Sequence, residues 1–177
     1  MAVLIEHLTG PVVMDTLPVI KLTHWYGTPA RDEVYTYARL CLCPEGLRVR
    51  MTVFDREPAP TETATVLLYL GTPLRLDFTR STARLTGSGT AADLPQTVFS
   101  AGADEQGWYW QADCLLSPAE LARLNAAPPA DGVAFDAAFF LRDTRELAFG
   151  SAFSCPTGKA PVPEDCRGQL VLFPCGG

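Results

Sequence analysis

A hairpin with strict alternation of apolar and polar residues is the feature that most constrains the fold of this sequence. On its return side, apolar residues alternate with polar ones in the order Leu47, Arg48, Val49, Arg50, Met51, Thr52 and Val53. A period of two places the apolar side chains on one face of a strand and the polar ones on the other. Residues 33–55, with a turn at 44–46, therefore predict an antiparallel hairpin with one buried face.

The rest of the chain repeats this strand signal in short segments separated by Gly and Pro. Further strands are predicted at 63–70, 74–79, 81–85, 97–100, 108–116, 133–141, 146–153 and 168–173. One helix is expected near 117–125, where Ser117 can be the N-cap, Pro118 fits the first helical position and Glu120 completes a capping box. About ten short strands with one short helix predict an all-β fold, an antiparallel β-sandwich of the jelly-roll type.

Size and charge limit the classes of partner. The chain has 177 residues, 47% of them hydrophobic, which suits one domain over 1–177 with its own core and with N-terminal strands in 1–24. A formal net charge of −6 argues against a nucleic-acid partner, which needs clustered Lys and Arg. The longest uncharged run, 63–73, is well short of the roughly 20 apolar residues of a membrane-spanning helix, so no membrane partner is expected.

The N-terminus and the cysteines both bear on the compartment of the protein. Residues 1–8 lack both a cationic segment and a long apolar segment, so they do not resemble a signal peptide, and a cytoplasmic location is expected. The six cysteines are therefore expected to be reduced thiols. Cys41 and Cys43 share a strand face; they are expected to be small buried side chains, and a zinc site with His24 or Cys155 is the alternative.

The C-terminal third resembles a known family. A strand opening on Trp110, a short helix closing on Leu121 and Leu124, and strands at 135–142, 149–153 and 168–172 follow one another in the order seen in family 9 carbohydrate-binding modules. The resemblance covers about 25–173. It implies a β-sandwich that binds a saccharide without catalysis. It also implies possible structural calcium, and no other cofactor is expected.

The sequence departs from the family pattern at positions where relatives contact sugar. The strand 65–70 carries no acid, Asp136 stands where the family often has Asn, and Phe153 stands where it tends to have Trp. The chain's single Asn is Asn125, so a saccharide would be held by Asp, Glu, Arg and Gln. These departures support an alternative function, a sandwich that has lost sugar binding and acts as a structural or protein-interaction module, as a homo-oligomer.

Candidate ligand-binding residues come from strand ends and from the resemblance. They are Trp25, Asp55, Arg56, Glu57, Arg80, Asp136, Arg142 and Phe153. Aromatic side chains can stack on sugar rings, carboxylates accept hydrogen bonds from hydroxyls, and Arg presents a rigid fork of donors. Solvated loop charges are the alternative interpretation for the acids and arginines.

Two further motifs favour structure over function. Trp108 and Trp110 share one strand face with Ala112, Cys114 and Leu116, which predicts a core face, while Tyr109 and Gln111 face the other way. The chain has two histidines, His7 and His24, and neither lies in a recognisable nucleophile motif. No catalytic residue is assigned; the sequence favours a non-catalytic protein and leaves enzymatic activity open.

Overall fold

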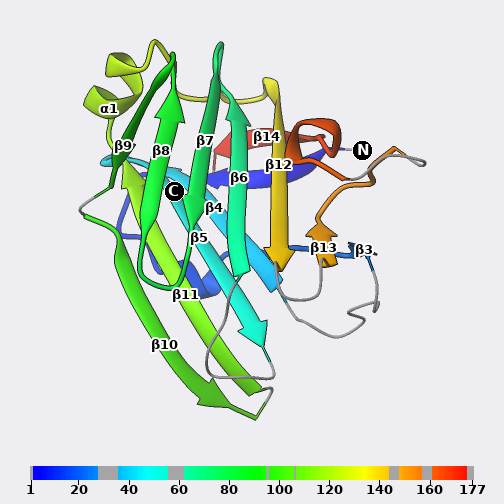
Figure 1. The fold of residues 1–177 in the computed structure, drawn as a ribbon. Helices are drawn as coiled ribbons and strands as arrows, with labels where there is room; N and C mark the ends of the chain where they lie inside the picture. The colour runs from blue at the N-terminus through cyan, green and yellow to red at the C-terminus, as the bar shows by residue number, and fades with distance from the viewer. Residues whose placement is uncertain are drawn as a thin grey trace.

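The protein is described here by a computed structural model that places residues 2–27, 36–55, 62–94, 96–105, 107–143, 148–156 and 161–174. Its strands form one mixed 14-stranded sheet that curls on itself into a sandwich (Figure 1). The predicted all-β sandwich is therefore confirmed. The expectation of a purely antiparallel sheet is wrong for one strand, because β1 (Val3–His7) runs parallel to both of its neighbours.

The strands follow one another in the sheet in the order β10-β11-β5-β4-β1-β14-β12-β6-β7-β8-β9. Their bounds are β2 Ile20–Lys21, β3 His24–Tyr26, β4 Thr36–Cys43, β5 Gly46–Asp55, β6 Glu62–Tyr69, β7 Pro73–Phe78, β8 Ala83–Gly87, β9 Thr90–Asp93, β10 Val98–Asp104, β11 Gly107–Leu116, β12 Ala134–Asp143, β13 Ala148–Ser151 and β14 Gly168–Pro174. Off this path, β13 pairs with β12 and β3, and β2 pairs with β4. The helices are η1 (Met14–Thr16), α1 (Pro118–Arg123) and η2 (Pro163–Asp165).

Strand β1 joins the two layers of the sandwich. It pairs with β14 from Val3↔Leu170 onward and with β4 at Glu6↔Cys41. The layer of β10, β11, β5 and β4 is thereby continuous with the layer of β14, β12, β6, β7, β8 and β9. Parallel pairing of segments this far apart in the chain leaves no local sequence signal, which is why the prediction missed it.

The predicted hairpins and helix are confirmed. The turn at 44–46 connects β4 to β5, and Ser117 forms a capping box with Glu120 at the start of α1. One strand, β9, was not predicted. Ser88 and Gly89, which follow the predicted strand 81–85, form a two-residue turn with positive φ at both positions, and this turn leads into β9. Within the described residues, no helix is long and apolar enough to cross a membrane.

The core lies between the two layers and is filled by their inward-facing side chains. Trp110, Phe78 and Phe139 are the largest fully buried ones, and the apolar face predicted for β5 is buried throughout. Trp108 departs from its predicted core position, with 44% of its surface exposed. Trp108 is the second residue of β11, and in Figure 1 the lower ends of β10 and β11 extend past the lower ends of β7 and β8.

The outer face of β4 has a smaller buried cluster under the N-terminal segment. Cys41 packs there with Met14 and Leu17, and Cys43 is also buried, as predicted for small side chains. Burial raises the pKa of the Cys41 thiol from 9.0 to about 12, and it also raises the pKa of the Cys43 thiol. Both thiols are therefore protonated and unreactive at neutral pH.

The expectation that all six cysteines are reduced is wrong for one pair. Cys155 and Cys166 form a disulfide across a sequence separation of 11, with their Cα atoms 4.5 Å apart. Cys41, Cys43 and Cys114 are free and buried. Cys175 lies outside the described residues. Which two cysteines meet depends on the tertiary path of the chain, and the sequence pattern does not contain that path.

Replacing Gly46 with alanine is expected to destabilise the fold by about 3 kcal/mol or more. Gly46 opens β5 with φ of +139°, a conformation that L-residues rarely adopt, and an added Cβ would overlap the backbone carbonyl of Leu116. Chemical denaturation followed by circular dichroism measures the change. Gly10→Ala is the matched control, because a Cβ at Gly10 meets no atom within 4 Å. Equal stability of the two variants would contradict the steric argument.

Candidate functional site

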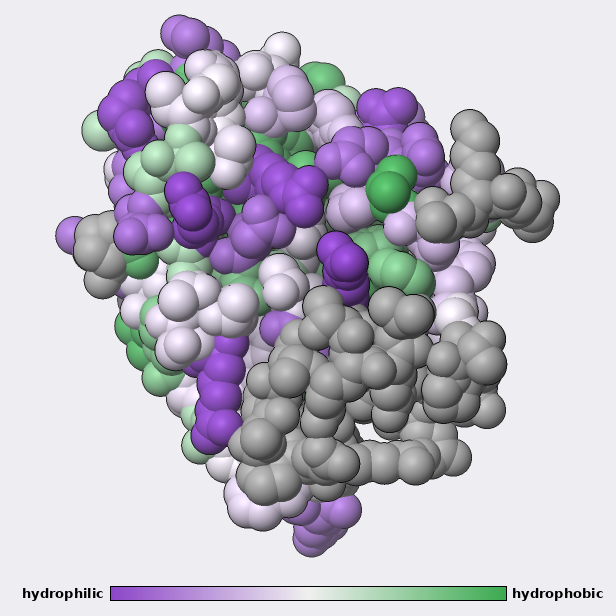
Figure 2. Space-filling view, viewed as in Figure 1, coloured by the Kyte–Doolittle hydropathy of each residue, from purple (hydrophilic) through white to green (hydrophobic). Residues whose placement is uncertain are grey.

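A pocket of about 290 Å³ lies on the outer face of β6, β12 and β13, where the segment 161–164 forms one wall. Its lining includes Thr63, Thr65, Arg75, Phe140, Arg142, Phe149 and Glu164. Figure 2 shows this face of the molecule, with hydrophilic side chains gathered over β6 and β7 and hydrophobic ones next to them toward β13. The pocket thus combines apolar and hydrogen-bonding groups.

The pleat of three paired strands builds the floor of this pocket. Arg142 of β12 lies opposite Thr63 of β6 on one side and opposite Phe149 of β13 on the other. Phe140, two residues earlier on β12, lies opposite Thr65. Alternation along β12 sends Phe139 and its second neighbours into the core, so Phe140 and Arg142 must face outward.

Two phenylalanines supply the apolar part of the floor. The rings of Phe140 and Phe149 have centroids 5.9 Å apart and planes 42° apart. Phe140 is buried, whereas Phe149 is only half-buried. Phe149 is therefore the ring that a ligand can contact, and Phe140 supports it from the side.

A chain of hydrogen bonds connects the floor to the wall. Nε of Arg75 donates to both carboxylate oxygens of Asp77, at 2.9 and 3.2 Å, and Nη1 of Arg75 donates to Oε1 of Glu164 at 3.2 Å. The Thr65 hydroxyl donates to the same Asp77 carboxylate at 2.7 Å. These contacts fix η2 above β6 and β7 and hold the polar groups of the pocket in place.

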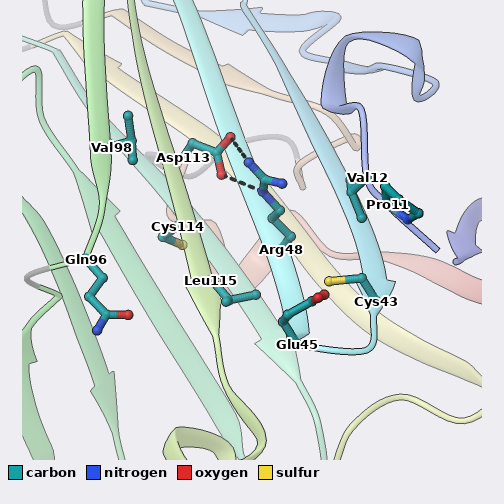
Figure 3. A pocket seen from close by; sticks show the side chains of 10 residues that line it. All are labelled: Pro11, Val12, Cys43, Glu45, Arg48, Gln96, Val98, Asp113, Cys114 and Leu115. Atoms are coloured by element: carbon teal, nitrogen blue, oxygen red, sulfur yellow. Dashed lines mark hydrogen bonds and ion pairs between the residues drawn. The ribbon is translucent and has the colours of Figure 1, made fainter. Parts of the chain in front are cut away.

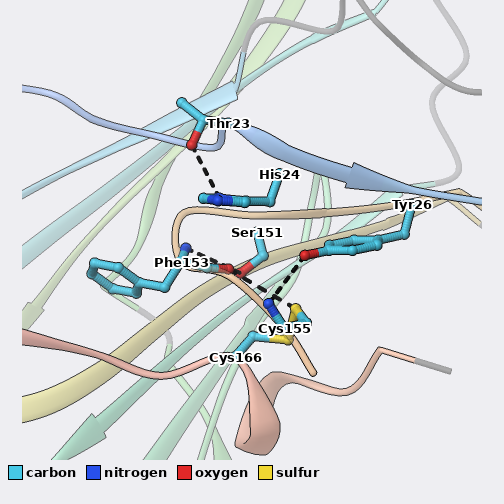
Figure 4. The surroundings of a disulfide bond; sticks show 7 residues. All are labelled: Thr23, His24, Tyr26, Ser151, Phe153, Cys155 and Cys166. Atoms are coloured by element: carbon cyan, nitrogen blue, oxygen red, sulfur yellow. Dashed lines mark hydrogen bonds between the residues drawn. A yellow bond between two sulfur atoms is a disulfide. The ribbon is translucent and has the colours of Figure 1, made fainter. Parts of the chain in front are cut away.

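The disulfide anchors the wall at the other end of the same segment (Figure 4). Cys166 is buried next to η2, and the backbone N–H of Cys155 donates to the Tyr26 hydroxyl at 3.0 Å. The residues 161–164 that form the wall lie between the two bonded cysteines. The crosslink therefore ties the pocket wall to β3.

Ser151 and His24 lie opposite each other in the β13–β3 pairing, as a nucleophilic serine and its histidine base could. The Ser151 hydroxyl donates to the carbonyl of Phe153 at 2.7 Å and accepts from its N–H at 3.3 Å. Nδ1 of His24 is 3.2 Å from the Thr23 hydroxyl (Figure 4). Ser151 therefore closes a tight turn, and His24 contacts a different hydroxyl.

A second pocket, of about 280 Å³, lies on the outer face of β5 and β11 (Figure 3). In it, Nε and Nη2 of Arg48 donate to the two oxygens of Asp113 at 3.1 and 3.2 Å, and this pairing raises the pKa of the Arg48 guanidinium. Arg50 also donates to Asp113, at 2.8 Å. None of the described residues that line this pocket is aromatic, and its buried carboxylate is already paired. It offers a saccharide less than the pocket over β6, β12 and β13.

No family model and no curated protein matches the chain. Solved structures do. The chain is similar to a carbohydrate-binding module of family 9 from Caldicellulosiruptor kristjanssonii in complex with cellotriose, with a TM-score of 0.62, 12% identity, and coverage of 99% of this chain and 95% of that one. It is also similar to a family 9 module from that organism in complex with glucose, with a TM-score of 0.59, 14% identity, and coverage of 98% and 97%.

The chain has the fold of a family 9 carbohydrate-binding module. This confirms the resemblance to family 9 modules over 25–173 and extends it over nearly the whole chain. At 12–14% identity the likeness establishes the family 9 fold alone. The ligand site must therefore be argued from this chain's own residues.

The structure places one of the predicted site residues, Arg142, in the pocket over β6, β12 and β13. Asp55 is the last residue of β5, opposite Trp108, and its side chain is not described; Arg56 and Glu57 lie outside the described residues. Arg80 is exposed in the turn between β7 and β8. In Figure 1 this turn, like the ends of β5 and β12, is at the lower end of the sandwich.

The other three predicted residues make contacts of their own outside the pocket. The Trp25 ring packs on Gly150, and the Phe153 ring packs on Gly168 and lies 6.3 Å from that of Phe139. A carboxylate oxygen of Asp136 is 3.7 Å from Nη1 of Arg167. Trp25, Asp136 and Phe153 are not among the described residues that line the pocket over β6, β12 and β13.

Calcium, which the resemblance implies, does not fit the carboxylates that the structure describes. Asp131 bonds to Nδ1 of His7 at 2.8 Å, and Asp136 pairs with Arg167. Across the described ranges of the chain, no group of three or more His, Cys, Asp or Glu side chains could hold a metal ion. Calcium requires six or more oxygen ligands at one point.

Most residues of the pocket were not among the predicted site residues. Thr63, Thr65 and Arg75 lie on the outward faces of β6 and β7, which alternation would have found once both strands were known. Phe149 was expected in a strand but not in a site. No local pattern could show that β6 lies beside β12, because that pairing joins residues about 80 apart in the chain, whereas β12 and β13 pair as neighbouring segments.

Proposed function

We propose that this protein is a non-catalytic carbohydrate-binding module that holds a saccharide in the pocket over β6, β12 and β13. One observation carries the proposal: the half-buried Phe149 ring lies beside the exposed Arg142 and the Thr63 hydroxyl on a single face of a family 9 fold. The similar solved structures contain cellotriose and glucose, which supports a saccharide as the ligand.

The chemistry of the pocket suits a sugar ring. Pyranose rings have apolar C–H faces, which pack on aromatic rings, and edges lined with hydroxyls, which both donate and accept hydrogen bonds. Phe149 provides the aromatic face, Arg142 provides donors, and the Thr63 hydroxyl can both donate and accept. At about 290 Å³ the pocket is at the small end of ligand sites, so a short saccharide or the end of a chain is expected.

Isothermal titration calorimetry against glucose, cellotriose and a broader panel of neutral and acidic oligosaccharides tests this function. At least one member is expected to bind with Kd between about 1 μM and 1 mM, with one ligand per chain. The absence of heat for every member at concentrations of about 10 mM would contradict saccharide binding. An unrelated polyol such as glycerol is the negative control.

A further inference from the structure

We propose that β10 is a dimerisation edge, at which a second copy of this chain adds its own β10 in antiparallel orientation. The sheet would then continue across a two-fold axis from one copy into the other. This inference is independent of the proposed saccharide site, which lies on β6, β12 and β13 in the other layer.

Strand β10 is an open edge of the sheet. It is the terminal strand in the sheet order, and among the described strands it pairs with β11 alone, from Val98↔Asp113 to Asp104↔Gly107. In Figure 1 no other element lies beside its outer side. None of its seven residues is buried. An edge of this kind carries a row of backbone N–H and C=O groups that another strand can pair with.

The protections that proteins place on edge strands are missing from β10. Its sequence, VFSAGAD, contains no Lys, Arg or Pro, and its one charge is at the end. The opposite edge of the sheet is shorter: β9 has four residues, and the adjacent turn is fixed to the end of α1 by the Ser88 hydroxyl, which donates to the carbonyl of Leu124 at 2.7 Å. Short edges resist strand addition, whereas longer ones permit it.

Apolar side chains are available on both faces of this edge. Val98 has 67% of its surface exposed, and it shares the outer face with Asp113. Trp108 has 44% exposed, on the other face, where it lies opposite Ala103. An incoming strand would therefore cover apolar surface on each face as well as satisfying backbone hydrogen bonds.

The pattern of β10 suits a second copy of itself in antiparallel orientation. With Ala101 on the two-fold axis, Val98 of one copy would lie opposite Asp104 of the other, and small side chains would meet at the centre. Parallel addition would place the two Asp104 carboxylates side by side, which is unfavourable. An antiparallel pair uses the same edge on both copies, so the assembly closes at two chains.

Sedimentation velocity over a concentration series tests the proposal. The wild-type chain is expected to dimerise with Kd on the order of 10 μM, because a pair of seven-residue strands buries a small interface. Ala101→Lys places two like charges at the axis and is expected to weaken dimerisation about tenfold or more. Ala91→Lys, at an exposed position of β9, adds the same charge to the opposite edge and should leave the dimer intact.

Three outcomes would overturn the proposal. A wild-type chain that stays monomeric up to about 500 μM would do so, and so would a dimer that persists in Ala101→Lys. Equal loss of dimer in both lysine variants would show a general charge effect. If Ala101→Lys fails to fold by circular dichroism, Ser100→Lys, on the opposite face of the same edge, is measured in its place.

Discussion

The Cys155→Ser variant is expected to lose stability and saccharide affinity together. The disulfide closes a loop with a sequence separation of 11, and constraining the unfolded chain over a loop of this length contributes about 3 kcal/mol. Residues 161–164, inside that loop, form the pocket wall. Without the crosslink, the wall is held by the Arg75–Glu164 contact and by packing, so a ligand must order it on binding.

Cys155 is the better residue to replace because it is only half-buried. A serine at the fully buried Cys166 would add the free-energy cost of burying a hydroxyl to the cost of losing the disulfide, and the two could not be separated. Thermal unfolding and calorimetric titration measure the two effects. Reductant should move the wild-type chain to the same values and leave the variant unchanged. A variant with wild-type affinity would show that the wall takes no part in binding.

Phe149→Ala is expected to lower saccharide affinity at least about tenfold while the fold is kept. The substitution removes the accessible ring of the pocket and leaves Arg142 and the polar groups in place. Because Phe149 is half-buried and packs on Phe140, stability should fall by about 1–2 kcal/mol. Titration at a temperature well below the unfolding midpoint separates lost binding from lost folding.

Trp108→Ala is the matched control for Phe149→Ala. Trp108 is an exposed aromatic residue at the lower end of β11, opposite Asp55 and outside the pocket. Its truncation should leave the affinity unchanged. The reverse result, with affinity lost in Trp108→Ala and kept in Phe149→Ala, would move the site to the strand ends near Asp55.

Local sequence patterns predicted most elements of this fold, with β9 as an exception. Period-two alternation identified β5 and its buried face, and the spacing of Ser117, Pro118 and Glu120 identified α1, because each of these signals is contained within one segment. Strand β1 joins the layers through parallel pairs with β14 and β4, and those pairs depend on distant residues. The prediction of a purely antiparallel sheet failed at this strand for that reason.

The candidate site was harder to predict than the fold. Arg142 was found because a guanidinium at a strand end is conspicuous in sequence. Thr63 and Phe149 carry no such signal, and they become site residues only because β6 and β13 flank β12 at that register. The Cys155–Cys166 bond that anchors the wall is likewise a product of tertiary structure.

Backbone amide chemical-shift mapping by NMR, during titration with the best ligand of the saccharide panel, tests the central claim most directly. If the saccharide binds over β6, β12 and β13, the largest shifts will fall on Thr63, Thr65, Phe140, Arg142 and Phe149, and those of Cys43, Glu45 and Asp113 in the second pocket will stay unchanged. Saturable shifts confined to the second pocket, or to the strand ends around Trp108, would contradict the assignment of the site.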